Sequence, residues 1–278
     1  MAYRDVLVVV DDTPERAQRM QFAARLAARH EAHLIGMMLR YGRTFAERTG
    51  AYVVAADEKR RRAAEDAAHT RIREELERQA RAAGVPVEWY SADGEPVRTV
   101  SLFCRHADIA VIGQSVDQPH ALGTVRDLAE HVALASGRPV VTVPRAGTPA
   151  GVGDRVMVAW DAGREAARAV ADSLPVLQRA EQVLIYSVDP EERGDRHGEV
   201  PGADLARHLA RHDVDARVET VSGSDADAGD LILNRIAEAG IDLLVMGAYG
   251  HTRIRELWLG GVTRQMMRNM TVPVLLSH

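Results

Sequence analysis

Cysteine and lysine are almost absent from this chain of 278 residues. Its one cysteine, Cys104, cannot form a disulfide within the chain or build a multi-cysteine metal site, and the sequence predicts it as a packed helix residue. Its one lysine, Lys59, does not follow a glycine. This excludes the P-loop pattern G-x-x-x-x-G-K-[ST] and leaves arginine as the main cation.

Long apolar runs are also missing, and none approaches the length that a membrane span needs. The opening stretch, MAYRDVLVVVDD, places acidic residues directly after a short apolar run, which does not suit a signal peptide. We therefore expect no membrane association and a cytoplasmic location. A net charge of −5 argues against a nucleic-acid partner, because such proteins usually carry a basic face.

An internal repeat organises the chain. Three pairs of segments match: Val6–Asp11 with Val156–Asp161, Asp108–Gly113 with Asp242–Gly247, and Arg138–Val143 with Thr271–Leu276. The first pair is offset by about 150 residues and the other two by about 134, so the first copy is longer in its middle. The boundary falls in the Gly- and Pro-containing stretch Arg145–Gly153. We predict one domain over 1–147 and a second over 153–278.

Strands alternate with helical stretches in both copies. In the first copy we expect strands over Asp5–Val10, His33–Leu39, Val85–Tyr90, Ile109–Ile112 and Pro139–Val143. We expect helices over Pro14–His30, Glu58–Ala83, Val97–His106 and Arg126–Ser136. Within Glu58–Ala83, the apolar stripe Ala68, Ile72, Leu76 and Ala80 favours an amphipathic helix. In the second we expect Arg155–Ala159, Gln182–Val188, Ala216–Val221, Leu243–Met246 and Val272–Leu276 as strands and Glu165–Arg179, Ala203–His212, Gly229–Ala239 and Val262–Met270 as helices. The central strands are rich in Val, Ile and Leu, which indicates a parallel sheet covered on both faces by helices. Right-handed crossovers then give an α/β, doubly wound fold.

A glycine-rich loop follows the apolar strand that ends at Gly247. Its glycines are Gly247, Gly250, Gly260 and Gly261, in the pattern G-x2-G-x9-G-G. Glycine lets a ligand approach the backbone closely, and a helix that begins near Gly260 would direct free N–H groups at an anion. The stretch therefore predicts a phosphate-binding loop.

This loop, set between the strand LLVMG and the closing strand VPVLL, resembles the nucleotide-binding signature of the universal stress protein family. The resemblance implies two tandem five-stranded parallel sheets, Rossmann-like, with strand order 3-2-1-4-5, and it implies that the protein binds ATP or a related adenine nucleotide. The family has Ser or Thr where this chain has Gly261. One hydroxyl contact to phosphate is therefore missing, while the backbone N–H groups of Gly261 and Val262 remain.

The same resemblance implies the site residues of the second copy. Asp161 would contact the sugar or a bound metal such as Mg²⁺, Val188 would present its backbone to the adenine, and the glycines with Val262 would hold phosphate. The complete nucleotide-binding set is Ala159, Trp160, Asp161, Val188, Met246, Gly247, Gly250, His251, Gly260, Gly261, Val262 and Thr263. Two plainer readings stay open: an Asp after a first strand often caps the next helix, and His251 can lie on a solvated loop. We assign no catalytic residues and no metal site made by protein side chains alone.

The first copy keeps Asp11 and Gly113 but departs from the loop pattern. With the offset of 134, Val116, Arg126 and Asp127 replace Gly250, Gly260 and Gly261. A β-branched residue obstructs close backbone approach, and an aspartate at a helix N-terminus occupies or repels the anion site. We expect this copy to be retained for structure and to bind no nucleotide.

Three functions fit these observations. The first is a stress-response sensor or regulator that binds ATP in its second copy. The second is an enzyme of weak ATP hydrolysis or phosphoryl transfer in the same crevice, although the motif supplies no general base apart from Asp161 and no phosphate-bridging lysine. The third is an interaction module without nucleotide. We favour the first, with at most slow hydrolysis.

The closing strands of the two copies, Pro139–Val143 and Val272–Leu276, are short and apolar. An unpaired apolar edge is a liability that proteins cover. In the universal stress protein family such a strand commonly forms the dimer contact, so the resemblance implies that the two copies pair through these strands within one chain. A homodimer of whole chains remains open.

Overall fold

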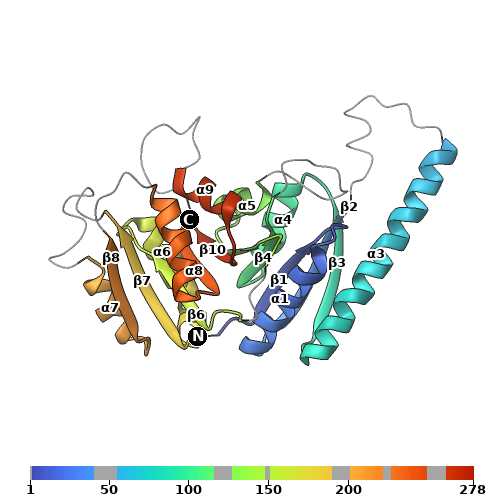
Figure 1. Ribbon diagram of the computed structural model, residues 1–278. Coiled ribbons are helices and arrows are strands. Elements are labelled where there is room, and N and C mark those ends of the chain that lie inside the picture. The colour runs from blue at the N-terminus through green and yellow to red at the C-terminus, as the bar shows by residue number, and fades with distance from the viewer. Residues whose placement is uncertain are drawn as a thin grey trace. The chain divides into compact units, whose positions relative to one another are not determined.

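The computed structural model describes residues 2–40, 55–115, 127–147, 151–189, 201–221, 227–248 and 261–278. Contacts divide the chain into two compact units, Tyr3–Ser136 and Gly137–His278. Each unit is an α/β sandwich with helices on both faces of a sheet (Figure 1). This is the layered arrangement that apolar strands alternating with amphipathic helices predict.

The first unit holds four parallel strands. They are β1 (Asp5–Val10), β2 (His33–Arg40), β3 (Val87–Asp93) and β4 (Ile109–Gly113). Their order is β3-β2-β1-β4, and every neighbouring pair is parallel. β1 and β4 are buried almost throughout, as strands covered on both faces must be.

Four helices cover this sheet. They are α1 (Arg16–His30), α3 (Ala55–Ala83), α4 (Pro96–Cys104) and α5 (Leu128–Ser136). α1 packs against α3, and α4 packs against α5. The predicted stripe of α3 is confirmed, because Ala68, Ile72, Leu76 and Ala80 are all buried. Cys104 is also buried, at the end of α4, and burial raises its pKa to about 12, so the thiol is inert.

The second unit repeats the arrangement. Its strands are β6 (Arg155–Ala159), β7 (Gln182–Val188), β8 (Ala216–Val221), β9 (Leu243–Gly247) and β10 (Val274–Ser277). Their order is β8-β7-β6-β9-β10, all parallel, so the predicted order 3-2-1-4-5 is confirmed. The helices are α6 (Arg164–Leu177), α7 (Ala203–Ala210), α8 (Ala228–Ala239) and α9 (Gly261–Asn269). In Figure 1, α8 lies in front of the sheet and α6 behind it, so the sheet is doubly wound.

β5 (Val140–Val143) belongs to the second unit by its contacts, although its sequence closes the first copy of the repeat. It pairs antiparallel with β10, with Val140 opposite Leu276 and Thr142 opposite Val274. The two closing strands therefore pair, as the family resemblance implies. All four residues of β5 are buried, so the apolar edge is covered.

The predicted element boundaries shift by a few residues. α1 begins at Arg16 rather than at Pro14, because the Asp11 carboxylate accepts a hydrogen bond from the Thr13 N–H and forms a turn there. β10 begins at Val274 rather than at Val272. Pro273, just before it, already contributes its carbonyl to the pairing with β9, because this carbonyl accepts a hydrogen bond from the Leu244 N–H. In the described part of the chain, no helix is both long and apolar enough to cross a membrane.

Candidate functional site

The candidate site lies where the winding of the second sheet reverses. β6 lies between β9 and β7 in the sheet. From β6 the chain continues to β7 and β8 on one side, and it then crosses to β9 on the other side of β6. Ligands of such sheets bind beyond the carboxyl ends of the strands at this point. The register sets Val158 opposite Val245, so Trp160 and Gly247 follow side by side at the two strand ends.

The structure brings several predicted residues to this end of the sheet. Ala159, Trp160 and Val188 are partly exposed, whereas the strands behind them are buried. The Trp160 N–H donates to the Tyr186 carbonyl at 2.9 Å, which continues the β6–β7 ladder one residue past β6. Met246 is the exception, since it is buried and can contribute only its backbone or the floor of the site.

Asp161 shapes the turn that follows β6. Its Oδ1 accepts a hydrogen bond from the Gly163 N–H at 2.9 Å, just before α6 begins. The plainer reading, that this aspartate simply caps the next helix, is wrong, because the N-cap of α6 is Gly163 and no described side chain caps it. Asp161 instead closes a local turn before the helix. The carboxylate is only partly buried, so a ligand can reach it.

Gly247 has a packing role that the sequence pattern did not reveal. A Cβ placed on it would lie 2.6 Å from the Ala166 nitrogen and from the Glu165 carbonyl carbon, both in the backbone of α6. Only glycine permits this close approach of strand and helix. It brings the first turn of α6, and with it the Asp161 turn, directly over the end of β9.

The start of α9 is the described part of the predicted phosphate-binding loop. Gly261 is exposed, its φ lies outside the left-handed region, and a Cβ there would meet nothing within 4 Å. Val262 is partly exposed, whereas Thr263 is buried and faces the core. The first turn of α9 contains no acidic residue, so its N–H groups suit an anion. Gly250, His251 and Gly260 lie outside the described residues.

One residue at this end of the sheet was not predicted. His278 follows β10, and its Nδ1 lies 3.0 Å from the Ala248 carbonyl oxygen, so with Nδ1 protonated it donates to that oxygen. The Ala248 N–H in turn donates to the Ser277 carbonyl at 2.8 Å. These two bonds fix the backbone directly after Gly247, where the glycine loop starts. Sequence spacing could not find this contact, because it depends on the β9–β10 pairing.

The equivalent aspartate of the first unit is held by an arginine. The Asp11 Oδ1 accepts hydrogen bonds from Thr13 and lies 2.7 Å from Nη2 of Arg19, whose side chain is 6% exposed. Burial acts to raise the Asp11 pKa, but the Arg19 charge and the hydrogen bonds outweigh it and hold the pKa below the ordinary 3.8. A Cβ on Gly113 would overlap the Arg19 guanidinium, so this side chain fills the space between the two strand ends.

The helix start in the first unit is acidic. Asp127 immediately precedes α5, and Glu130 lies buried in its first turn with Oε2 lacking a hydrogen-bond partner. Burial raises the Glu130 pKa, and the neighbouring Asp127 raises it further. Two carboxyl groups at this helix N-terminus oppose the binding of phosphate.

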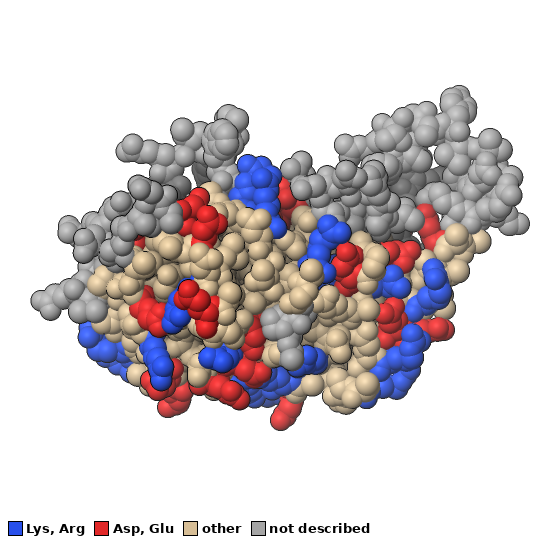
Figure 2. All heavy atoms as spheres, viewed as in Figure 1, with Lys and Arg blue, Asp and Glu red and all other residues tan. Residues whose placement is uncertain are grey.

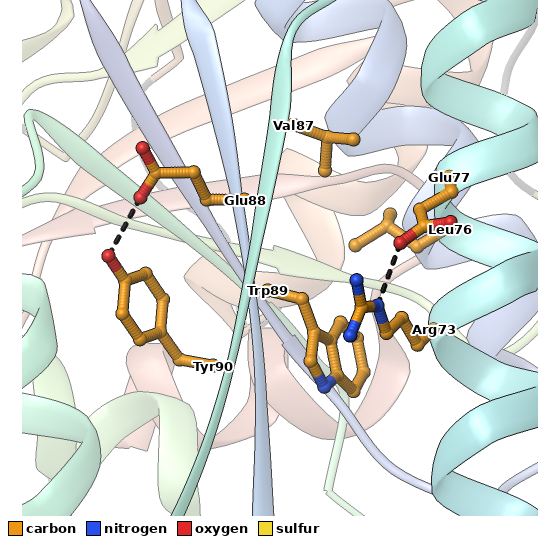
Figure 3. A pocket seen from close by; sticks show the side chains of 7 residues that line it. All are labelled: Arg73, Leu76, Glu77, Val87, Glu88, Trp89 and Tyr90. Carbon is orange, nitrogen blue, oxygen red and sulfur yellow. Dashed lines mark hydrogen bonds and ion pairs between the residues drawn. The ribbon is translucent and has the colours of Figure 1, made fainter.

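A hollow of about 280 Å³ lies in the first unit between α3 and the edge strand β3 (Figure 3). It is lined by Trp89, Leu76 and Val87 with four polar residues, Arg73, Glu77, Glu88 and Tyr90. The polar groups already pair with one another: Arg73 Nε lies 2.7 Å from Glu77, and the Tyr90 hydroxyl donates to Glu88 at 2.7 Å. The hollow contains none of the predicted site residues and no charged group left over for a phosphate.

The surface charges are mixed. Figure 2 shows acidic and basic side chains interspersed on the visible face, with no broad area of basic residues alone among the described ones. Across the described ranges, no three or more His, Cys, Asp and Glu side chains are arranged to hold a metal ion. A Mg²⁺ ion at the strand ends would therefore need nucleotide phosphates as further ligands beside Asp161.

Comparisons with known proteins agree with this architecture. A universal stress protein from Archaeoglobus fulgidus DSM 4304 superposes with a TM-score of 0.74 at 18% identity, covering 98% of this chain and 97% of its own. A functionally unknown protein from Pseudomonas aeruginosa PAO1 gives a TM-score of 0.58 at 15% identity, covering 99% of this chain and 92% of its own. At these identities the likenesses show the fold alone.

Sequence comparison identifies the family. A universal stress protein from Synechocystis is 46% identical over 48 residues, which is only 17% of each chain. The model of the universal stress protein family matches residues 2–144 and again residues 153–278. Since these two matches cover nearly the whole chain, the protein belongs to the universal stress protein family and contains its domain twice in tandem.

Proposed function

We propose that the second unit binds an adenine nucleotide, ATP in the first instance, and that the protein acts in the stress response as a nucleotide-dependent sensor or regulator in the cytoplasm. The observation that carries the proposal is the meeting of the Asp161 turn, the end of β9 at Gly247 and the end of β7 at Val188 at one switch point. These are positions at which the family resemblance implies nucleotide contacts.

Each part of the nucleotide has a matching group. The partly exposed Asp161 carboxylate suits ribose hydroxyls or a Mg²⁺ ion carried by the phosphates. The partly exposed end of β7 at Val188 suits the edge of the adenine ring. The start of α9, at Gly261 and Val262, offers N–H groups without a side chain in the way.

The residues at this site suit nucleotide binding better than they suit rapid ATP hydrolysis or phosphoryl transfer. A phosphoryl-transfer enzyme needs a positioned base and cations that neutralise the developing charge. Here the Asp161 carboxylate is engaged by the Gly163 N–H, and the chain's single lysine, Lys59, belongs to the first copy. We expect at most slow hydrolysis of bound ATP.

The test is calorimetric titration of the full chain with Mg-ATP, ADP, AMP and adenosine. One nucleotide should bind per chain, because the first unit holds Asp11 with Arg19 and presents carboxyl groups at α5. Gly250→Val, which copies Val116 of the first copy, should abolish binding and leave the circular dichroism spectrum unchanged. Two equivalent sites, or full affinity in the variant, would contradict the proposal.

Two substitutions at Asp161 separate its turn role from its ligand role. Asp161→Asn keeps an oxygen that can accept from the Gly163 N–H but removes the charge, whereas Asp161→Ala removes both. Loss of a hydrogen bond to a charged group costs about 1.5–3 kcal/mol, so Asp161→Asn should weaken ATP binding by roughly 10-fold or more. Asp215→Ala, at an exposed aspartate beside β8, is the control and should leave affinity unchanged.

A further inference from the structure

Two histidines lie four residues apart at the C-terminal end of α7. His208 lies in the last turn of α7 and is exposed, and His212 follows the helix and is partly exposed. Their ring centroids are 4.8 Å apart, with the rings inclined at 64°. The two imidazoles therefore already lie next to each other on one surface.

The backbone that carries the pair is well anchored. Leu205 and Leu209 of α7 are buried and anchor the helix. Past the helix, the His212 N–H donates to the Leu209 carbonyl at 2.8 Å, and the His212 carbonyl accepts from the Gln178 side chain at 3.0 Å. Only side-chain rotation is left to bring the two rings onto a common ligand.

Their separation suits a shared metal ion. Imidazole nitrogens bind zinc at about 2.0–2.1 Å, so in a tetrahedral complex the centres of two ligating rings lie roughly 5 Å apart. Two histidines four residues apart on one helix form such a pair in metalloproteins. Here the turn after α7, rather than the helix itself, brings His212 next to His208. Imidazole favours copper, nickel and zinc, whereas magnesium and calcium favour oxygen ligands.

We propose that His208 and His212 form a surface site for one divalent transition-metal ion, with water completing its coordination. The described residues supply no third metal-binding side chain there, which makes the site open and exchangeable rather than structural. The nearby Arg207 is paired with Asp204, which offsets its charge next to an incoming cation. The site is independent of the nucleotide crevice, since neither histidine is among the crevice residues.

The experiment is calorimetric titration of the untagged full chain with Zn²⁺ and then Cu²⁺, without nucleotide. One ion should bind per chain, Cu²⁺ more tightly than Zn²⁺, and Mg²⁺ in large excess should not compete. His208→Ala and His212→Ala should each weaken Zn²⁺ binding at least 10-fold. Zn²⁺ should also raise the melting temperature of the wild type and not that of either variant.

A matched control is His106→Ala, which removes an exposed histidine at the end of α4 and should leave Zn²⁺ affinity unchanged. His208→Ala and His212→Ala change exposed or partly exposed side chains, so each variant should keep the wild-type circular dichroism spectrum. Absence of Zn²⁺ binding in the wild type would overturn the proposal. Unchanged affinity in both His208→Ala and His212→Ala would overturn it as well.

Discussion

The two units use the same aspartate in different ways. Asp11 and Asp161 both follow the first strand of their sheet, and each accepts a hydrogen bond from the N–H two residues on. In the first unit the buried Arg19 guanidinium also pairs with this carboxylate and fills the space beside Gly113. In the second unit the backbone of α6 fills the corresponding space beside Gly247.

Under our proposal, this difference is an exchange of ligand binding for internal stability in one copy of a duplicated domain. In the first unit, Arg19 neutralises the Asp11 carboxylate, so no bound ligand or metal ion is needed to do so. The helix that follows the fourth strand shows the same contrast, with Asp127 and buried Glu130 at the start of α5 and the exposed, uncharged Gly261 at the start of α9. Both differences assign nucleotide binding to the second unit under our proposal.

The largest effect should come from Arg19→Met, which leaves the mostly buried Asp11 carboxylate without its cation. Removal of one partner from a buried ion pair is strongly destabilising, so we expect a loss of about 3 kcal/mol in the free energy of unfolding. Urea denaturation followed by circular dichroism measures it. Arg207→Met is the control, because Arg207 forms an exposed pair with Asp204 and its loss should cost about 0.5 kcal/mol or less.

The effect of Arg19→Met should depend on pH. The folded-state pKa of Asp11 lies below its ordinary value of 3.8, so its stabilisation is present above that pH and is lost as the pH falls through the folded-state pKa. The gap between wild type and variant should therefore be full at pH 7 and narrow below pH 3.8. A gap of constant size would mean that Arg19 stabilises the unit by packing alone.

A smaller effect is expected for Gly247→Ala. The added Cβ would meet the α6 backbone at 2.6 Å, and backbone cannot move aside as a flexible side chain can. Overpacking of this kind costs about 1–3 kcal/mol, and ATP affinity should fall with it because the Asp161 turn shifts. Gly261→Ala is the matched control, with open space around its Cβ, and thermal denaturation of both variants makes the comparison.

Glu130→Gln should stabilise the first unit by about 1 kcal/mol at pH 7, because it removes a buried negative charge whose Oε2 has no hydrogen-bond partner. The pKa of Glu130 is raised above its ordinary 4.5, so the carboxyl favours the folded state below that pH and this contribution is lost as the pH rises. The extra stability of Glu130→Gln over the wild type should vanish near pH 4, where the wild-type carboxyl is protonated in the folded state. Equal gains at both pH values in urea titrations would show that ionisation is not the cause.

The smallest effect belongs to Gly261→Ser, which adds the hydroxyl that the family pattern has at this position. The site has room, and the φ of Gly261 is open to a serine. ATP affinity should rise by about 0.5–1.5 kcal/mol, the net value of one hydrogen bond, while adenosine affinity stays unchanged. A fall in ATP affinity alone would show that the loop needs glycine itself at this position.

The residue pattern was sufficient to predict the helices and strands, and the family resemblance supplied the order of the strands. The stripe from Ala68 to Ala80 predicted both the helix and its buried face, and the strand order followed from the family resemblance and is confirmed. The strand-end position of Asp161 and Gly247 was also predictable, because residues that follow neighbouring parallel strands meet at one edge.

Contacts made by single side chains across the fold could not be predicted. Arg19 reaches Asp11 from within a helix, and nothing in its spacing distinguishes it from the many other arginines. His278 meets Ala248 only because β9 and β10 are paired in one register. The packing of Gly247 on α6 could not be predicted either, because a glycine in a turn and a glycine in contact with a helix cannot be distinguished by sequence.

The antiparallel pairing of β5 with β10 has a consequence for synthesis on the ribosome. β5 is complete at Val143, but its partner begins only at Val274, near the end of the described chain. At about 5–20 residues per second, β5 waits roughly 7–26 s with its apolar residues lacking this partner. During that interval β5 can pair with strands of neighbouring nascent chains on a polysome, and the emergence of β10 ends this exposure.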